Sequence, residues 1–231
     1  MGQAAVALPT GSHAPPIASC ETPHALSQRL ALVKPPCFWP ALPGKASLSQ
    51  IERAGLIRLA DSIPGVCDAE EMVALIEAMR HAPTGDVVEV GSGSGRTAAL
   101  LVWLARRYQI GAVLCLDAWD PDGLADFEID LAPIADGRLN YMPADEASAY
   151  GEGLVVRTAT FGDTSYQGRI ALLRLNAADE DAMRWKQAVT PGGWIIFGGE
   201  TNAGEAFLDA NRANVCAAFR AGDSRFIQLK R

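Results

Sequence analysis

The stretch that decides the fold, residues 86–96, reads DVVEVGSGSGR. Its first part, Val87 to Val90, is apolar except for Glu89 and predicts a buried strand. Three glycines at alternate positions follow and predict a sharp turn, after which residues 95–107 predict a helix. The backbone N–H groups at the start of such a helix are free to bind a ligand. The stretch therefore predicts a binding loop between a strand and a helix.

Strand and helix patterns alternate on both sides of this loop. Further strands are predicted at 112–117, 154–157, 170–175, 194–197 and 226–229, and helices at 24–33, 47–62, 69–81, 123–134, 179–189 and 204–219. Strands that are apolar on both faces and separated by helices are typical of a parallel sheet with helices on each side. We therefore expect an α/β, Rossmann-like fold with a mainly parallel sheet of about six strands and an N-terminal helical extension.

The domain boundaries follow from composition and from these patterns. Residues 1–22 are rich in Ala, Gly, Pro and Ser and predict a flexible N-terminal tail. Residues 23–82 form the expected helical extension, in which Asp68 is placed to cap the helix at 69–81. Residues 83–231 form the expected Rossmann-like domain.

The bulk properties exclude several classes of partner. The chain has 231 residues and a net charge of −7, which disfavours binding to nucleic acid. Its apolar runs are shorter than the roughly 20 residues that span a bilayer, so no membrane partner is expected. The first basic residue is Arg29, and the five cysteines form no C-x-x-C pair. We therefore expect a cytoplasmic protein without a secretory signal, a redox pair or a zinc site.

Asp117 ends the second predicted strand and is the candidate partner of the glycine loop. In dinucleotide-binding folds an acid at this distance binds ribose hydroxyls. The spacing Gly93-x-Gly95-x-x-Ala98 also fits a nicotinamide or flavin site, and a strand–turn–helix unit without a ligand is the third interpretation.

Two motifs resemble those of class I S-adenosylmethionine-dependent methyltransferases. DVVEVGSGSG at 86–95 looks like their first motif, and PGGWIIF at 191–197 looks like the turn into their fifth strand. The resemblance implies that S-adenosylmethionine is the cofactor and that a small molecule is the substrate. It also implies a set of cofactor-binding residues: Glu89 near the methionine amino group, Gly91, Ser92, Gly93, Ser94 and Gly95 in the loop, Asp117 at the ribose, Ala118 and Trp119 at the adenine, and Asn176 after the fourth strand.

The chain is most similar to the small-molecule and sugar O-methyltransferases, but it departs from their metal site. The resemblance places metal-binding acids at the ends of the fourth and fifth strands, where this chain has Asn176 and glycine. A hard cation prefers charged oxygen ligands, so we expect no metal. Asp179 and Glu200 are the candidate catalytic bases, with helix capping and a solvated loop as their structural alternatives. Two accounts remain: metal-independent O-methyl transfer, and a non-catalytic cofactor-binding or regulatory protein.

The predicted elements at the end of the chain differ from the family pattern. Class I methyltransferases close their sheet with a hairpin, whereas only the strand at 226–229 is predicted here. This favours an open site or one completed by another subunit. Phe38 and Trp39 could pack on such a subunit, and we expect a homodimer.

Overall fold

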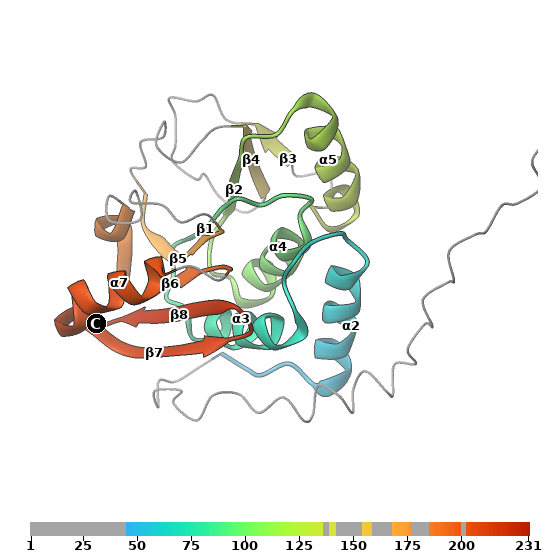
Figure 1. Ribbon diagram of the computed structural model, residues 1–231. Helices are drawn as coiled ribbons and strands as arrows, with labels where there is room; N and C mark the ends of the chain where they lie inside the picture. The colour runs from blue at the N-terminus through green and yellow to red at the C-terminus, as the bar shows by residue number, and fades with distance from the viewer. Residues whose placement is uncertain (1–44, 136–138, 142–153, 159–167, 177–184, 200–201) are drawn as a thin grey trace, which may run out of the picture.

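The glycine loop follows β1 (Asp86–Val90), which lies in the interior of a mixed sheet. The computed structural model describes residues 45–135, 139–141, 154–158, 168–176, 185–199 and 202–231 (Figure 1). Within these residues the sheet has eight strands in the order β3-β4-β2-β1-β5-β6-β8-β7. The other strands are β2 (Val113–Asp117), β3 (Leu139–Tyr141), β4 (Leu154–Thr158), β5 (Ile170–Leu175), β6 (Val189–Phe197), β7 (Val215–Ala221) and β8 (Ser224–Leu229).

The sheet is parallel from β3 to β6, and only β8 runs against its neighbours. Successive strands after β1 lie on one side of it, and β5 lies on the other side. The strand order therefore reverses between β1 and β5, which is where α/β folds leave a crevice for ligands. The predicted fold class is confirmed by this architecture.

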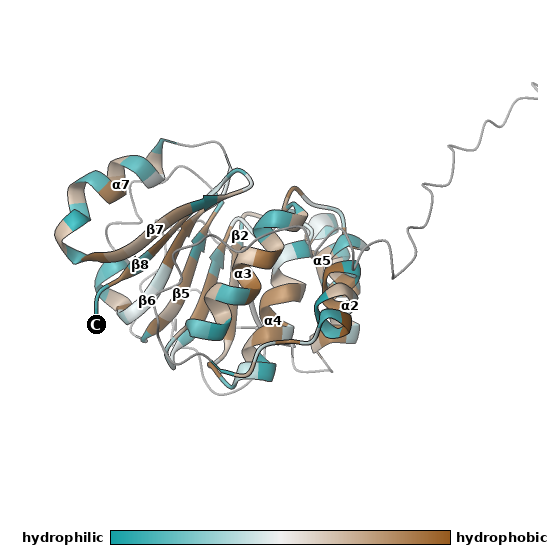
Figure 2. Ribbon diagram, turned by 90° about the horizontal axis from the view of Figure 1, so that it is seen from below, coloured by the Kyte–Doolittle hydropathy of each residue, from teal (hydrophilic) through white to brown (hydrophobic). Residues whose placement is uncertain are grey.

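Helices cover both faces of the sheet. The described helices are α2 (Gln50–Asp61), α3 (Ala69–His81), α4 (Arg96–Tyr108), α5 (Pro121–Ala135) and α7 (Ala203–Asn211), with short 3-10 turns at Lys186–Ala188 and Arg212–Asn214. Figure 2 shows α7 on the opposite side of the sheet from α3 and α4. Neighbouring residues of β1 divide between the two layers: Val87 packs with α3 and α4, and Val88 packs in the core that contains Phe207 of α7.

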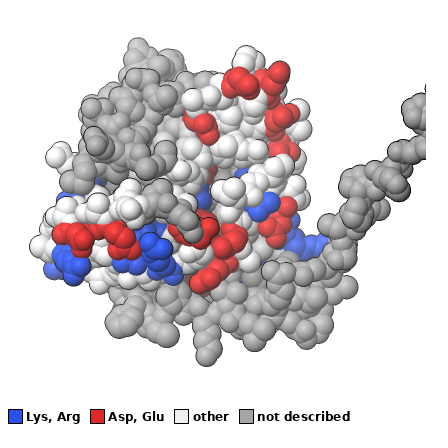
Figure 3. All heavy atoms as spheres, viewed as in Figure 1, with Lys and Arg blue, Asp and Glu red and all other residues white. Residues whose placement is uncertain are grey.

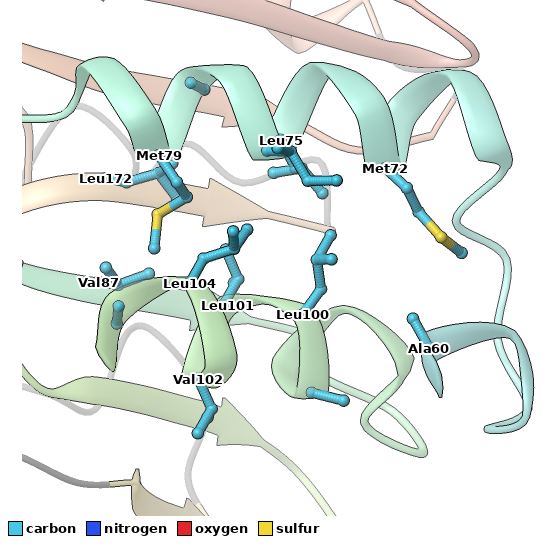
Figure 4. Packing of buried hydrophobic residues seen from close by; sticks show 14 of the residues in the cluster. Ala60, Met72, Leu75, Met79, Val87, Leu100, Leu101, Val102, Leu104 and Leu172 are labelled. Carbon is cyan, nitrogen blue, oxygen red and sulfur yellow. The ribbon is translucent and has the colours of Figure 1, made fainter. Parts of the chain in front are cut away.

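The larger core joins α3 and α4 to the sheet. Figure 4 shows the apolar side chains of α3 facing those of α4, with Val87 and Leu172 of the sheet beside them. Met72, Leu75 and Met79 are spaced along one face of α3, and all three are fully buried. As predicted, Asp68 caps this helix: its carboxylate accepts a hydrogen bond of 2.8 Å from the Glu71 N–H.

The C-terminal hairpin corrects the sequence prediction. The expected helix at 204–219 ends at Asn211, and Val215–Ala221 forms β7, which pairs antiparallel with β8 across a turn at Gly222. The alanines of this segment favoured a helix, but pairing with β8 prevails because Phe219 stacks on Phe226 at 5.0 Å. Gly222 has φ +54°, which suits the tight turn. The expected unclosed sheet is therefore wrong.

Smaller differences concern strand ends. β6 begins at Val189 rather than Trp194, and the short strand β3 was not predicted. The predicted tail, the helix at 24–33, Phe38 and Trp39 lie outside the described residues, as does most of the helix predicted at 179–189.

Among the described helices, none has the length and apolar character needed to cross a membrane.

Candidate functional site

A pocket of about 220 Å³ opens at the carboxyl ends of β1 and β5. Three parts of the chain surround it. Its lining residues are Gly91, Ser92, Gly93 and Ser94 of the glycine loop, Pro64, Gly65, Val66 and Cys67 of the loop before α3, and Arg96, Thr97, Arg174 and Asn176 of α4 and the end of β5. The pocket lies at the reversal of strand order, where the fold predicts a ligand.

The three glycines of the loop all have positive φ, but they differ in the space available for a side chain. Gly91 and Gly95, at φ +78° and +97°, have no room for a side chain: a Cβ would lie 2.9 Å from Asn176 Cβ and 2.6 Å from Leu131 Cδ2, respectively. Gly93, at φ +54°, has no atom within 4 Å of the same position. Packing therefore accounts for two of the glycines, whereas Gly93 leaves open space beside the loop.

The carboxylate of Asp117 holds the open part of the loop. Its Oδ2 accepts a 2.7 Å hydrogen bond from the N–H of Gly93, and its Oδ1 accepts one of 2.7 Å from the N–H of Ala118. The Trp119 indole donates to the Gly93 carbonyl at 2.7 Å and packs against Phe127, with 4.6 Å between ring centroids. A carboxylate has about four acceptor positions, so Asp117 keeps about two for a ligand.

Asn176 joins the end of β5 to the start of the glycine loop. Its Nδ2 donates to the Gly91 carbonyl at 2.6 Å. A side chain at Gly198, just after β6, would collide with the Asn176 amide oxygen. Asn176 is therefore fixed from both sides and lies at the pocket wall.

Glu89 lies beneath the loop rather than in the pocket lining. The residue is fully buried, and its Oε1 accepts a 3.1 Å hydrogen bond from Arg174 Nη1. Arg174 also donates to Glu71 Oε1 of α3, at 2.6 Å from Nη2 and 3.3 Å from Nε. We call Glu71, Arg174 and Glu89 the buried triad. Arg174 is the member of the triad that lines the pocket.

Burial alters the ionisation of the groups under the loop. Desolvation raises the pKa of Glu89 to about 7, although the guanidinium of Arg174 acts in the opposite direction. Desolvation also raises the pKa of the Cys115 and Cys67 thiols. These thiols therefore stay neutral and are poor nucleophiles.

The loop before α3 is held against the pocket by Arg96. This side chain donates from Nε to the Ile63 carbonyl at 2.8 Å and from Nη1 to the Cys67 carbonyl at 3.2 Å. Val66 stands at the rim of the pocket and is 95% exposed. No sequence motif indicated that this connection between two helices forms a pocket wall.

The surface beside the glycine loop is acidic. Figure 3 shows a row of acidic side chains over α5, the helix that packs on Gly95 through Phe127 and Leu131. Asp122, Asp126 and Asp130 recur at every fourth position of that helix and so share one face. Their negative charge attracts a cationic ligand and repels phosphate.

The structure brings together most of the predicted site residues and leaves others outside. Gly91 to Ser94 and Asn176 line the pocket, and Asp117 and Trp119 form hydrogen bonds with Gly93 of its wall. The candidate bases Asp179 and Glu200 lie outside the described residues. Within the described part of the chain, no three His, Cys, Asp or Glu side chains are grouped as metal ligands would be.

The roles of Glu71 and Arg174 were not predicted from the sequence. The available signal was an arginine inside the otherwise apolar run IALLRL at 170–175. A charged residue in a buried strand needs a buried partner, and Glu89 on the neighbouring strand β1 is one of them.

Comparisons with known proteins identify the fold. No family model matches the chain, and no curated protein matches it. Among solved structures, the SAM-dependent O-methyltransferase from Thermotoga maritima is 14% identical, with a TM-score of 0.52 over 75% of this chain and 71% of that chain. The O-methyltransferase NovP is 14% identical, with a TM-score of 0.51 over 70% of this chain and 80% of that one. The cofactor-bound structure of Rv0187 from MTB is 14% identical, with a TM-score of 0.51 over 77% of this chain and 88% of that chain. At such identities the likeness concerns the architecture, and this chain has the Rossmann-like α/β fold of these methyltransferases.

Proposed function

We propose that the protein binds S-adenosylmethionine in this pocket and transfers its methyl group to a hydroxyl of a small polar acceptor, such as a sugar or a secondary metabolite. The observation that carries the proposal is the hydrogen bond from the Gly93 N–H to the Asp117 carboxylate, at a point of the loop that has open space beside it. Two free acceptor positions on Asp117 match the two hydroxyls of a ribose. The O-methyltransferases with the same fold support the choice of reaction.

Each part of the pocket has a proposed partner on the cofactor. Asp117 holds the ribose, and Ala118 and Trp119 pack against the adenine. Gly91, Ser92, Gly93, Ser94 and Gly95 of the loop, with Asn176, surround the methionine end, and Glu89 acts on its amino group from beneath the loop. The row of acids over α5 favours a cationic cofactor over the phosphate-containing nicotinamide alternative.

The sulfonium supplies a methyl group that is already activated, so the protein's own task is to place the acceptor hydroxyl in line and to receive its proton. Orientation alone lowers the barrier of such a transfer by several kcal/mol. We propose Asp179 or Glu200 as the proton acceptor and a reaction without metal. Turnover should then persist in the presence of a strong chelator, and its loss with recovery on adding magnesium would contradict this part of the proposal.

The decisive measurement is calorimetric binding of S-adenosylmethionine and S-adenosylhomocysteine to Asp117→Ala. Losing charge-assisted bonds to two hydroxyls should weaken binding by about ten- to a hundredfold. The matched control is Asp209→Ala, which removes the same charge from an exposed position on α7, away from the pocket lining, and should leave the affinity within about threefold. Unchanged binding by Asp117→Ala would contradict the placement of the ribose.

Turnover separates the enzyme from the alternative function. Labelled cofactor incubated with candidate hydroxyl acceptors should yield S-adenosylhomocysteine. Cofactor binding without turnover across a broad acceptor set would favour the non-catalytic cofactor-binding or regulatory protein. The homodimer, the cytoplasmic location and the three-part division of the chain stay predictions, and a monomeric mass in solution would contradict the first of them.

A further inference from the structure

The buried triad contains more negative charge than positive charge. Arg174 is the single cation between the carboxylates of Glu71 and Glu89, and their side chains are 2%, 5% and 0% exposed, respectively. With all three groups ionised, the triad has a net charge of −1 in a region without solvent. An uncompensated buried charge is costly, and two acids that share one partner relieve the cost by keeping a proton on one of them.

Glu89 is the acid that holds this proton. Glu71 receives two hydrogen bonds from Arg174 and lies in the first turn of α3, where the helix dipole stabilises a negative charge. Glu89 receives one bond from Arg174, at 3.1 Å, and is the more buried of the two. Its pKa, which burial raises to about 7, agrees with this assignment.

The groups that face Glu89 leave it no other charge partner in the described residues. The β5 side contributes Arg174, the α3 side contributes Glu71, and β2 contributes the Cys115 thiol, which lies 4.0 Å from Glu89 Oε2. Ser92 of the glycine loop faces it through its hydroxyl. Among the parts of the molecule that the structure describes, the adjacent pocket is where a further positive charge can come close to Glu89, because its wall includes Arg174 and the loop residues just beyond Glu89.

The proposed cofactor and its product differ by one such charge. S-adenosylmethionine has a sulfonium, an ammonium and a carboxylate, for a net charge of +1, whereas S-adenosylhomocysteine lacks the sulfonium charge and is neutral. A cation in the pocket favours ionised Glu89, and a neutral ligand has a weaker effect.

We propose, as an extension of the proposed function, that Glu89 is a specificity-determining residue: it releases a proton when the cationic cofactor binds and thereby makes the site prefer S-adenosylmethionine to S-adenosylhomocysteine. The proton passes from the Glu89 carboxyl to solvent, and no bond of the ligand changes. After methyl transfer the ligand is neutral, and Glu89 takes the proton back. The site then binds the product more weakly than it bound the cofactor.

The expected signature is a pH-dependent ratio of two affinities. Below pH 7 Glu89 is neutral and the ratio is low. Above pH 7 its charge is present without cost, so the preference for S-adenosylmethionine should rise by about tenfold between pH 6 and pH 8.5. Calorimetry at pH 7 in two buffers of different ionisation heat gives the number of protons released on binding.

Three proteins are compared: the wild type, Glu89→Gln and Glu77→Gln. The amide of Glu89→Gln keeps the shape and the acceptor for Arg174 but cannot ionise, so its affinity ratio should vary less with pH and it should release fewer protons than the wild type. The ligand's amino group titrates equally for all three proteins, and the difference between variants isolates Glu89. Glu77 is another buried acid of α3, paired with Arg53 and Arg80 and absent from the pocket lining, so Glu77→Gln should behave as the wild type.

Two failures are distinguishable. If both ligands bind but the wild type and Glu89→Gln show the same ratio and the same proton release, this inference is overturned and the proposed function stands. If neither ligand binds the wild type at any pH, the proposed function fails and the inference fails with it. A wild-type affinity ratio that stays constant between pH 6 and pH 8.5 also overturns the inference, and this outcome does not depend on whether Glu89→Gln folds.

Discussion

Helix α3 contributes an acid to each of two buried ion clusters, and the clusters have opposite compositions. At one end Glu77 pairs with Arg53 at 3.2 Å and with Arg80 at 2.9 Å, and these arginines are 22% and 27% exposed. At the other end Glu71 and Glu89 share Arg174, which is 2% exposed. The first cluster has one acid and two cations in contact with water, and the second has two acids and one cation without it.

From this difference we infer a structural role for the Glu77 cluster and propose a functional one for the triad. Glu77 has two cations beside it, and both are in contact with solvent, so the cluster can join α2 to α3 without a further charged partner. The triad is short of one positive charge and lies under the pocket wall. Buried charge imbalance at a pocket is typical of sites that receive a charged ligand.

The largest expected effect is the loss of stability in Arg174→Met. The change leaves two buried carboxylates without a cation, and breaking a buried pair in this way costs about 3–5 kcal/mol. Urea denaturation at pH 8 measures it. Arg53→Met is the matched change in the other cluster and should cost about 1 kcal/mol or less, because Arg80 remains with Glu77 and solvent screens the loss. Equal losses in the two variants would contradict the comparison.

The second expected effect is a fall in stability with rising pH. The pKa of Glu89 in the folded protein, about 7, lies above its ordinary value of 4.5, so the folded state binds more protons than the unfolded state between these values. Its contribution to stability is complete below pH 4.5 and is lost as the pH rises through 7, by at most about 1.4 kcal/mol for each pH unit.

Denaturation of the wild type and of Glu89→Gln at pH 5, 6, 7 and 8 measures this contribution. The stability of the wild type relative to the variant should fall along the series. Parallel curves would show that Glu89 does not hold a proton in the folded protein, and the distinction between the two clusters would then lie in burial alone.

Local sequence signals were sufficient for the framework of the molecule and for the wall of the pocket that the glycine loop forms. A strand, alternate glycines and a helix follow one another within residues 86–108, and the structure has them as β1, the loop and α4. Asp117 was predicted because it ends the second strand, at the distance from the glycine loop where dinucleotide-binding folds have an acid, and it does contact Gly93. These features depend on short spacings, which a sequence displays directly.

The triad and the hairpin depend on partners that are distant or ambiguous in sequence. Glu71 and Arg174 are separated by 103 positions, and only the packing of α3 beside β5 brings them together. The segment at 215–221 contains alanines that suit a helix, and its pairing with β8 decides the outcome. Tertiary contacts prevail over local propensity in both cases.

The smallest expected effect belongs to Glu77→Gln, and it gives the comparison its sharpest control. The amide can still accept hydrogen bonds from Arg53 and Arg80, whose charges remain partly solvated. The variant should therefore lose about 1 kcal/mol of stability. Both arginines are partly exposed, so water can solvate their charges once the Glu77 carboxylate is gone. The loss of stability should therefore be the same at pH 6 and pH 8. Urea denaturation at both values, with calorimetric binding of S-adenosylmethionine beside it, tests the two statements together. A change in cofactor affinity beyond about twofold would mean that the Glu77 cluster is coupled to the pocket through α3, and the two clusters would then act as one.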